Sequence, residues 1–335
     1  MKHINVALFV PDLGCPNRCS FCNQKTISGK SKPLEIDEVD SAVQIALGGR
    51  KDTSDGEIAF FGGSFTAIDR QYMAALLQRA KKYIDMGLFK GIRISTRPDC
   101  IDEEILSVLK KYGVTSIELG CQSMDDRVLS MNDRGHSSKA VYDSAALIKN
   151  MGFELGVQMM TGLWGDSDET AIETAEKLIS LKPDTVRIYP TVILENTRLH
   201  ELYLKGEYTP QSVDEASSLC ARLIVMFENA GVRVIRVGLH SGGNVEDGFI
   251  AGAFHPAFKE LCDGKIYLNK VLEEISQKQI EKGAIEISVC PKYISALTGQ
   301  KKCNIIHLEK LGYRVKIVKQ DTLKKYDVNV RGLQI

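Results

Sequence analysis

Short β-branched runs alternate with amphipathic helical stretches along the first 240 residues of the chain. In the helical stretches apolar residues recur every three or four positions, whereas the strand-like runs are apolar and rich in valine and isoleucine. We expect strands at Ile4–Val10, Glu57–Phe61, Gly91–Ser95, Ser116–Leu119, Glu154–Met160, Thr185–Tyr189 and Val232–Val237. We expect helices at Ile36–Leu47, Gln71–Asp85, Asp102–Lys111, Ser138–Asn150 and Asp168–Ser180. Repeated strand–helix units favour a parallel sheet covered by helices, with functional residues at the carboxyl ends of the strands.

Length and composition agree with a globular chain of one large domain and an appendage. The chain has 335 residues, of which 44% are hydrophobic and 26% charged, which is ordinary for such proteins. Lys plus Arg and Asp plus Glu number 43 each, so only local charge bears on a nucleic-acid partner. The given N-terminus has no long apolar run with a cleavage site, and no apolar run reaches membrane-spanning length, so we expect a cytoplasmic protein without a membrane partner. Nine cysteines without a secretion signal favour reduced thiols or metal ligands over disulfides.

Three cysteines follow the first predicted strand at C-x₃-C-x₂-C spacing, namely Cys15, Cys19 and Cys22. Three thiolates suit a four-iron cluster that keeps one iron open, whereas a structural zinc ion usually has four ligands. No fourth cysteine or histidine is near in the sequence, since Cys100 is far downstream. Buried or zinc-binding cysteines are the alternative interpretation.

Unusual residues also follow the other predicted strands. The second strand runs into a double glycine, which lets the backbone approach a ligand closely. The carboxyl ends of strands two to six and the segments after them contain Gly62-Gly63-Ser64, Ser95-Thr96-Arg97-Pro98-Asp99, Cys121-Gln122 with Arg134 beyond them, Gln158 and Arg187-Ile188-Tyr189.

These motifs, in this order, resemble the radical S-adenosylmethionine (SAM) enzymes. From about residue 8 to about residue 210 the chain is similar to the radical SAM domain of the Elongator catalytic subunit family, and more distantly to coproporphyrinogen dehydrogenases. The resemblance implies an α/β fold, a partial (β/α)6 radical SAM barrel with a small α+β C-terminal domain. It also implies a [4Fe-4S] cluster on Cys15, Cys19 and Cys22, reduction of SAM to a 5′-deoxyadenosyl radical, and an electron donor such as a flavodoxin or ferredoxin.

The resemblance also implies roles for single residues. Gly62, Gly63 and Ser64 correspond to the family's glycine motif for the SAM amino group, although many members have Glu where this chain has Ser64. Gln122 resembles the residue that reaches the SAM ribose, Arg134 resembles the arginine that pairs with the SAM carboxylate, and Gln158 stands where relatives contact the ribose hydroxyls. Thr96 and Arg97 are expected at the mouth of the site. For Arg97 a surface salt bridge is the alternative.

Three further residues near the site have weaker assignments. Cys121 either packs in the core or donates a hydrogen atom, and packing is favoured. Asp133 and His136 are expected to organise their loop. The chain ends without room for the acetyltransferase domain of the Elongator subunit, so we expect no acetyl-CoA-dependent carboxymethylation in the Elongator manner.

Beyond the barrel we expect a capping segment and a connector helix over residues 241–282, after a barrel domain of residues 1–240. His240 and His255 either touch substrate or are structural, the latter being favoured. The connector helix is expected at Tyr267–Glu281.

Residues 283–335 are predicted to form a small separate domain. We expect strand Ala284–Val289, helix Pro291–Leu297, turn Gly299–Lys302, helix Asn304–Leu311 and strand Tyr313–Val318. This order is similar to a KH RNA-binding core, although only Gly299 of the usual two turn glycines is present. From Pro291 to the end the chain has ten Lys and Arg residues against three Asp and Glu, which suits phosphate contacts.

The favoured hypothesis is therefore a radical SAM enzyme that modifies RNA, and tRNA in particular. One alternative is a radical reaction on a small metabolite or porphyrin-like molecule. The other is an iron–sulfur or zinc RNA-binding adaptor without catalysis. Nothing in the sequence indicates an oligomeric state.

Overall fold

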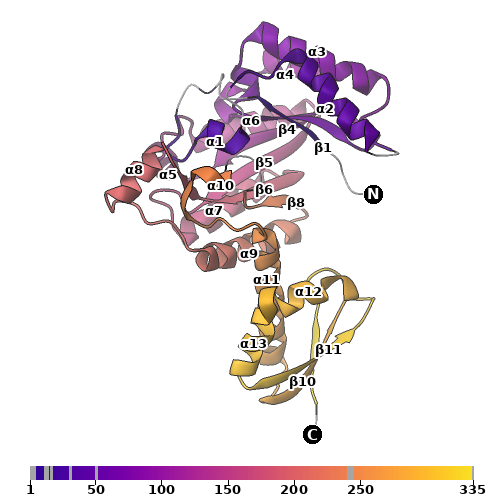
Figure 1. The fold of residues 1–335 in the computed structure, drawn as a ribbon, viewed down its shortest axis with the longest axis vertical. Helices are drawn as coiled ribbons and strands as arrows, with labels where there is room; N and C mark the ends of the chain where they lie inside the picture. Colours follow the sequence, from indigo (N-terminus) through magenta and orange to yellow (C-terminus); the bar gives the residue numbers. More distant parts are fainter. Residues whose placement is uncertain are drawn as a thin grey trace.

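The computed structural model describes residues 5–10, 15, 18–29, 32–49, 52–239 and 245–333. Its larger part is a curled, open parallel sheet with helices on its outer side, and its smaller part lies below that sheet in Figure 1.

The main sheet has seven strands in the order β1-β2-β3-β4-β5-β6-β8, and all neighbours are parallel. The strands are β1 Asn5–Val10, β2 Glu57–Gly62, β3 Gly91–Thr96, β4 Val114–Gln122, β5 Glu154–Thr161, β6 Thr185–Pro190 and β8 Arg233–Val237. Every predicted strand is present, and the expected α/β half-barrel is confirmed. The expected (β/α)6 barrel has six strands, whereas this sheet has seven, because β8 pairs with β6 at its edge.

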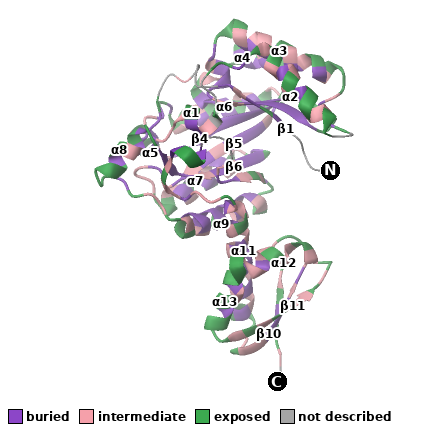
Figure 2. Ribbon diagram, viewed as in Figure 1, coloured by how far each residue is buried: buried purple, intermediate pink, exposed green. Residues whose placement is uncertain are grey.

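Amphipathic helices cover the outer face of this sheet and bury its apolar side chains (Figure 2). The long ones are α2 Ile36–Gly48, α3 Arg70–Asp85, α4 Glu103–Lys111, α6 Ser138–Asn150, α7 Asp168–Ser180 and α9 Val213–Asn229. Side chains such as Asp102 and Ser167 cap their N-termini by accepting backbone N–H groups. The five predicted helices are confirmed, whereas α9 was not anticipated. Within the described ranges, no helix is both long and apolar enough to cross a bilayer.

Short elements connect the strands at the carboxyl edge of the sheet. They are α1 Gln24–Ser28, η1 Phe65–Ala67, η2 Pro98–Cys100, α5 Asp126–Met131, α8 Arg198–Leu204 and α10 Val245–Gly248, with a two-stranded sheet of β7 Val192–Leu194 and β9 Phe249–Gly252. The candidate site lies among these connections.

The C-terminal lobe, residues 283–333, has a three-stranded sheet with its own apolar core. Its elements are β10 Gly283–Val289, η3 Pro291–Tyr293, α12 Ile294–Thr298, η4 Gln300–Lys302, α13 Cys303–Lys310, β11 Tyr313–Lys319 and β12 Asn329–Gly332. The central strand β10 is parallel to β11 and antiparallel to β12. The predicted strand–helix–turn–helix–strand order is confirmed, and β12 is additional. Likeness to a KH domain stays a prediction.

One long helix, α11 Phe258–Gln277, belongs to both apolar cores. Its first half packs Cys262 and Ile266 into the barrel core, and its second half packs Val271 and Ile275 into the core of the C-terminal lobe. The predicted connector helix, Tyr267–Glu281, is present, but its predicted bounds begin and end too late, because the helix starts at Phe258 in the barrel core and stops at Gln277. The division into residues 1–240, 241–282 and 283–335 stays a prediction.

Candidate functional site

The loop that carries the three cysteines is held against the barrel by Ser20. The Ser20 hydroxyl donates to Asn132 Oδ1 at 2.7 Å, its N–H donates to the Asn132 carbonyl, and its carbonyl accepts the Leu199 N–H at 2.8 Å. Beside it, Phe21 packs against an apolar cluster that includes Leu199 and Trp164. These contacts leave Cys19 buried and Cys15 and Cys22 half-buried.

Two cysteines of this loop face the glycine segment at the end of β2. The Cys15 thiol lies near the backbone N–H of Ser64. The Gln24 amide lies 3.4 Å from Cys22 Sγ and donates to the Gly62 carbonyl at 3.3 Å. The cysteine loop and the glycine segment are therefore parts of one site, although about 40 residues of sequence separate them.

Gly62 has a structural reason to be glycine. Its φ is +112°, and a Cβ there would lie 2.3 Å from the Val10 carbonyl oxygen. The neighbouring Gly63 N–H donates to the same carbonyl at 2.9 Å. The end of β1, where the cysteine loop begins, thus lies tightly against the glycine segment.

The thiols of this site are unfavourable places for an isolated negative charge. Burial raises the pKa of Cys15, and burial together with Cys19 raises the pKa of Cys22 to about 12. Iron in a cluster supplies the positive charge that keeps coordinating thiols deprotonated. In the described part of the chain, no three His, Cys, Asp or Glu side chains converge as ligands of a single metal ion. The cysteine ligands of a four-iron cluster each bind a different iron.

A chain of hydroxyl groups joins the ends of β2 and β3. Thr96 Oγ1 lies 2.8 Å from Ser64 Oγ and 2.6 Å from Thr66 Oγ1, and the Arg97 N–H donates to Ser64 Oγ at 3.2 Å. The Cys100 thiol lies near the Ser64 side chain. Sequence separation had set Cys100 apart from the site, but the end of β3 brings a fourth thiol to it.

Two buried polar atoms near these strand ends have no hydrogen-bond partner among the described residues. Arg97 is 2% exposed and gives Nε and Nη2 to Asp99, at 2.9 and 2.7 Å, so that only its Nη1 is unpaired. Arg97 is thus buried itself, but its ion-pair partner Asp99 reaches the surface, with a side chain that is 29% exposed. Gln122 is 9% exposed, takes a φ of +65° where the register of β4 against β5 shifts, and has an unpaired Oε1. A donor and an acceptor are therefore free to bind a polar ligand.

Arg134 reaches the site from the turn after α5. Its Nη1 lies 3.4 Å from Cys19 Sγ, its Nε donates to His136 Nε2 at 3.1 Å, and its Nη2 donates to the Gly120 carbonyl. Asp133, in the same turn, forms an ion pair with Arg198. These contacts agree with loop-organising roles for Asp133 and His136.

Other candidate residues lie away from this cluster. Cys121 packs in the barrel core and donates to the Leu119 carbonyl, in agreement with the favoured packing role. His255 Nδ1 accepts the Ala257 N–H at 3.0 Å, a contact within its own loop. His240 lies outside the described residues.

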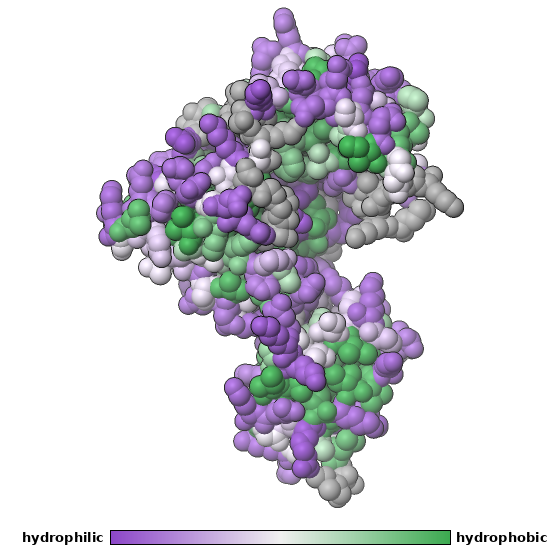
Figure 3. Space-filling view, viewed as in Figure 1, coloured by the Kyte–Doolittle hydropathy of each residue, from purple (hydrophilic) through white to green (hydrophobic). Residues whose placement is uncertain are grey.

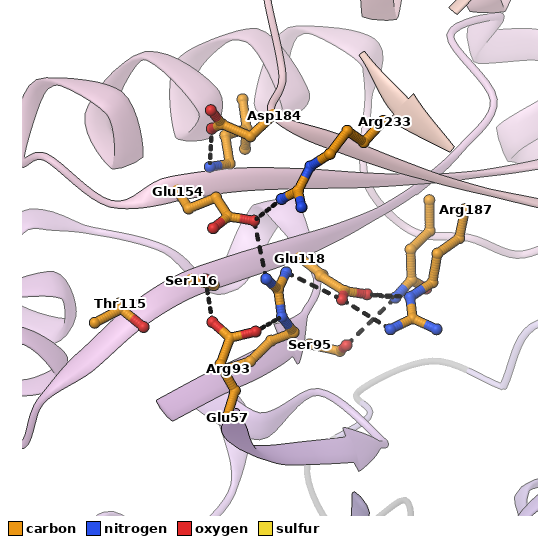
Figure 4. A network of polar contacts seen from close by, with 12 residues as sticks. Glu57, Arg93, Ser95, Thr115, Ser116, Glu118, Glu154, Asp184, Arg187 and Arg233 are labelled. Carbon is orange, nitrogen blue, oxygen red and sulfur yellow. Dashed lines mark hydrogen bonds and ion pairs between the residues drawn. The ribbon is translucent and has the colours of Figure 1, made fainter. Parts of the chain in front are cut away.

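The concave face of the sheet carries a layer of ion pairs that the sequence analysis did not anticipate (Figure 4). Arg93, 2% exposed, pairs with Glu57 at 2.8 Å, Glu154 at 2.9 Å and Glu118 at 3.4 Å, while Arg187 pairs with Glu118 through Nε and Nη2. The signal that would have found them is charge at alternate positions within otherwise apolar strands.

Gln158 is anchored in this layer. Its Nε2 donates to Glu118 Oε2 at 2.9 Å and lies 3.3 Å from Ser95 Oγ. The remaining predicted contacts, Gly62, Gly63, Ser64, Thr96, Gln122 and Arg134, gather with the cysteines at the strand ends.

A curled parallel half-barrel with a three-thiol loop after its first strand defines a class of α/β enzymes, and the family comparison agrees. The model of the radical SAM superfamily matches residues 10–178, about half of the chain, and that of the radical SAM C-terminal domain matches residues 183–267. The chain belongs to the radical SAM superfamily. It is accordingly an enzyme of the class that uses a [4Fe-4S] cluster and SAM.

The chain is similar to Elongator proteins over its barrel. Elongator complex protein 3 of Homo sapiens is 32% identical over 190 residues, which cover 51% of this chain and 35% of that protein. The tRNA uridine(34) acetyltransferase of Methanocaldococcus jannaschii is 29% identical over 180 residues, which cover 48% and 33%. The chain thus spans about a third of the length of these curated relatives. The archaeal Elp3 of Methanocaldococcus infernus, with residues 1–46 deleted, has the same fold, at a TM-score of 0.64 and 20% identity over 84% of this chain and 66% of that one.

Proposed function

We propose that Cys15, Cys19 and Cys22 hold the [4Fe-4S] cluster, and that SAM binds beside it. The observation that carries this proposal is the contact between the cysteine loop and the glycine segment, through Ser64 and Gln24. The proposed SAM contacts are Gly62, Gly63, Ser64, Thr96, Gln122, Arg134 and Gln158.

When bound, the reduced cluster and SAM supply a 5′-deoxyadenosyl radical that removes a hydrogen atom from the substrate. The chain's own groups have simpler tasks. The unpaired Gln122 Oε1 accepts a hydrogen bond from a hydroxyl or ammonium group of SAM, and the unpaired Arg97 Nη1 is a second hydrogen-bond donor, besides Arg134, for the SAM carboxylate. Ser64 and Thr96 fix one another through their hydroxyl groups, so the wall of the site is rigid before SAM arrives.

We further propose that the substrate is RNA, and tRNA in particular, because relatives are named for acting on tRNA uridine 34. The C-terminal lobe supplies basic residues for phosphate contacts. Lys316 and Arg331 pair with Glu286, and Lys325 pairs with Glu228. The basic residues of this lobe without an ion pair in the described ranges are Lys292, Lys301, Lys302, Lys310, Arg314, Lys319 and Lys324.

The proposed RNA surface runs from the turn between α12 and α13 to β11. Lys301 and Lys302 are exposed and both take left-handed backbone angles in this turn, with φ of 51° and 61°. The space-filling view shows apolar side chains on the C-terminal lobe near α12 and β11 (Figure 3), and the partly buried Ile294, Val315 and Ile317 belong to these elements. Such a surface suits a single-stranded nucleic acid. The cationic groups can bind its phosphates, and the apolar groups can contact its bases.

The test of this function is chemical. Protein reconstituted without oxygen, with SAM and a reductant such as reduced flavodoxin, should form 5′-deoxyadenosine in larger amounts when bulk tRNA is added. Nucleoside mass spectrometry of that tRNA should then show one new or altered nucleoside. SAM cleavage that tRNA does not stimulate, with no altered nucleoside, would favour the alternative of a small metabolite or porphyrin-like substrate.

A further inference from the structure

The guanidinium of Arg134 is fixed beside a cysteine of the proposed cluster site. Arg134 is 7% exposed, and its Nη1 lies 3.4 Å from Cys19 Sγ. Its other two nitrogen atoms donate to His136 Nε2 and to the Gly120 carbonyl. All three nitrogen atoms are therefore engaged, and rotation of the guanidinium away from Cys19 would break two buried hydrogen bonds.

The neighbours of Arg134 are suited to this placement. His136 accepts through Nε2, which requires a neutral ring, and desolvation with the nearby Arg134 charge lowers the pKa of His136 to about 4. At Gly120 a Cβ would lie 2.8 Å from Arg134 Nη2 and 3.1 Å from Gln122 Nε2. The glycine thus leaves the space that the guanidinium occupies.

A hydrogen bond and a positive charge at a cluster sulfur favour the reduced cluster, because reduction adds negative charge to the iron–sulfur unit. We propose that Arg134 raises the reduction potential of the cluster by donating a hydrogen bond from Nη1 to Cys19 Sγ. Arg134 is a positioning residue in this respect, since it acts on the cluster through Cys19. The proposal rests on the assignment of Cys19 as a cluster ligand, and it concerns the protein before SAM binds.

The test is the midpoint potential of the reconstituted cluster without SAM, followed by electron paramagnetic resonance during a redox titration. Arg134→Gln should lower the potential so that the equilibrium constant for reduction falls at least tenfold, which corresponds to about 59 mV for one electron. Arg134→Lys should have a potential between those of the wild type and Arg134→Gln, because lysine keeps the positive charge but lacks the rigid planar guanidinium.

The control is Arg127→Gln. Arg127 also donates to a sulfur atom, Met131 Sδ at 3.6 Å, but it is exposed and Met131 is not a cluster ligand. Its substitution should leave the potential unchanged. An equal shift in Arg127→Gln would contradict a specific effect of Arg134.

Full iron content with an unchanged potential in Arg134→Gln would overturn the inference while leaving the cluster assignment intact. Should Arg134→Gln fail to keep its cluster, Gly120→Ala decides the question, because it displaces the guanidinium without removing its charge. We expect a shift to lower potential in Gly120→Ala, and an unchanged potential there would equally overturn the inference. A wild-type protein that binds no iron would instead overturn the proposed function.

Discussion

The Ser20 hydroxyl donates a buried hydrogen bond to Asn132 Oδ1 at 2.7 Å, across 112 positions of sequence. This contact joins the cysteine loop to the turn that carries Arg134. The Asn132 amide also donates to the Val128 and Trp164 carbonyls, so its side chain connects three segments around the site. The segment around Ser20 is therefore held in place by protein contacts that do not involve the three thiols.

Asn132→Ala should destabilise the chain by about 2–4 kcal/mol, because it leaves the buried Ser20 hydroxyl and the Trp164 carbonyl without this partner, while the Val128 carbonyl keeps the backbone N–H of residue 132. Ser20→Ala removes one bond and should cost about 1 kcal/mol. Thermal unfolding measures both, and iron content after reconstitution should fall in the same order. Equal stability of Asn132→Ala and the wild type would contradict this role.

Glu118 should be the most sensitive residue of the ion-pair layer. It is 1% exposed and contacts both Arg93 and Arg187. Glu118→Ala leaves two buried guanidinium groups undercompensated, and we expect a loss of about 3–5 kcal/mol in unfolding free energy. The exposed pair Lys139–Asp143 is the control, and Asp143→Ala should cost under 1 kcal/mol in the same denaturant titration.

The stability of the cluster-free protein should fall on acidification, in part through His136. Its pKa lies at about 4 in the folded chain, against 6.5 for an ordinary histidine. Between these pH values the unfolded chain binds the extra proton, so the free energy of unfolding rises with pH. The full effect is on the order of 3 kcal/mol. His136→Gln keeps an acceptor for Arg134 and should flatten the pH dependence, and an unaltered slope would exclude His136 as its source.

The regular part of the fold was predictable because each strand and helix has its own apolar pattern. All seven strands of the barrel sheet follow from apolar or β-branched runs such as Thr185–Tyr189. The ion-pair layer did not follow, because Arg93 and Glu118 are far apart in sequence and meet only when β3 pairs with β4. For the same reason Cys100 was not expected beside Ser64.

The C-terminal lobe decides between the RNA and small-molecule hypotheses. Changing Lys301 and Lys302 together to Glu should weaken tRNA binding at least tenfold at low salt, and it should reduce the slope of log affinity against log salt by somewhat under one unit for each lost phosphate contact. SAM cleavage without substrate should not change, because the barrel site lies elsewhere. Lys139→Glu, on barrel helix α6, is the control. A wild-type protein that binds no RNA at low salt would remove the RNA proposal.

The account depends most on the three-cysteine site. Iron should be measured in anaerobically reconstituted protein, together with 5′-deoxyadenosine formed from SAM under reduction. We expect about four irons per chain and SAM cleavage in the wild type, and loss of both when Cys15, Cys19 and Cys22 are replaced together by Ala. The control is Cys100→Ala, which removes the neighbouring thiol near Ser64 and should leave the iron content unchanged. A triple variant that still carries the cluster and cleaves SAM would contradict the assignment of the site.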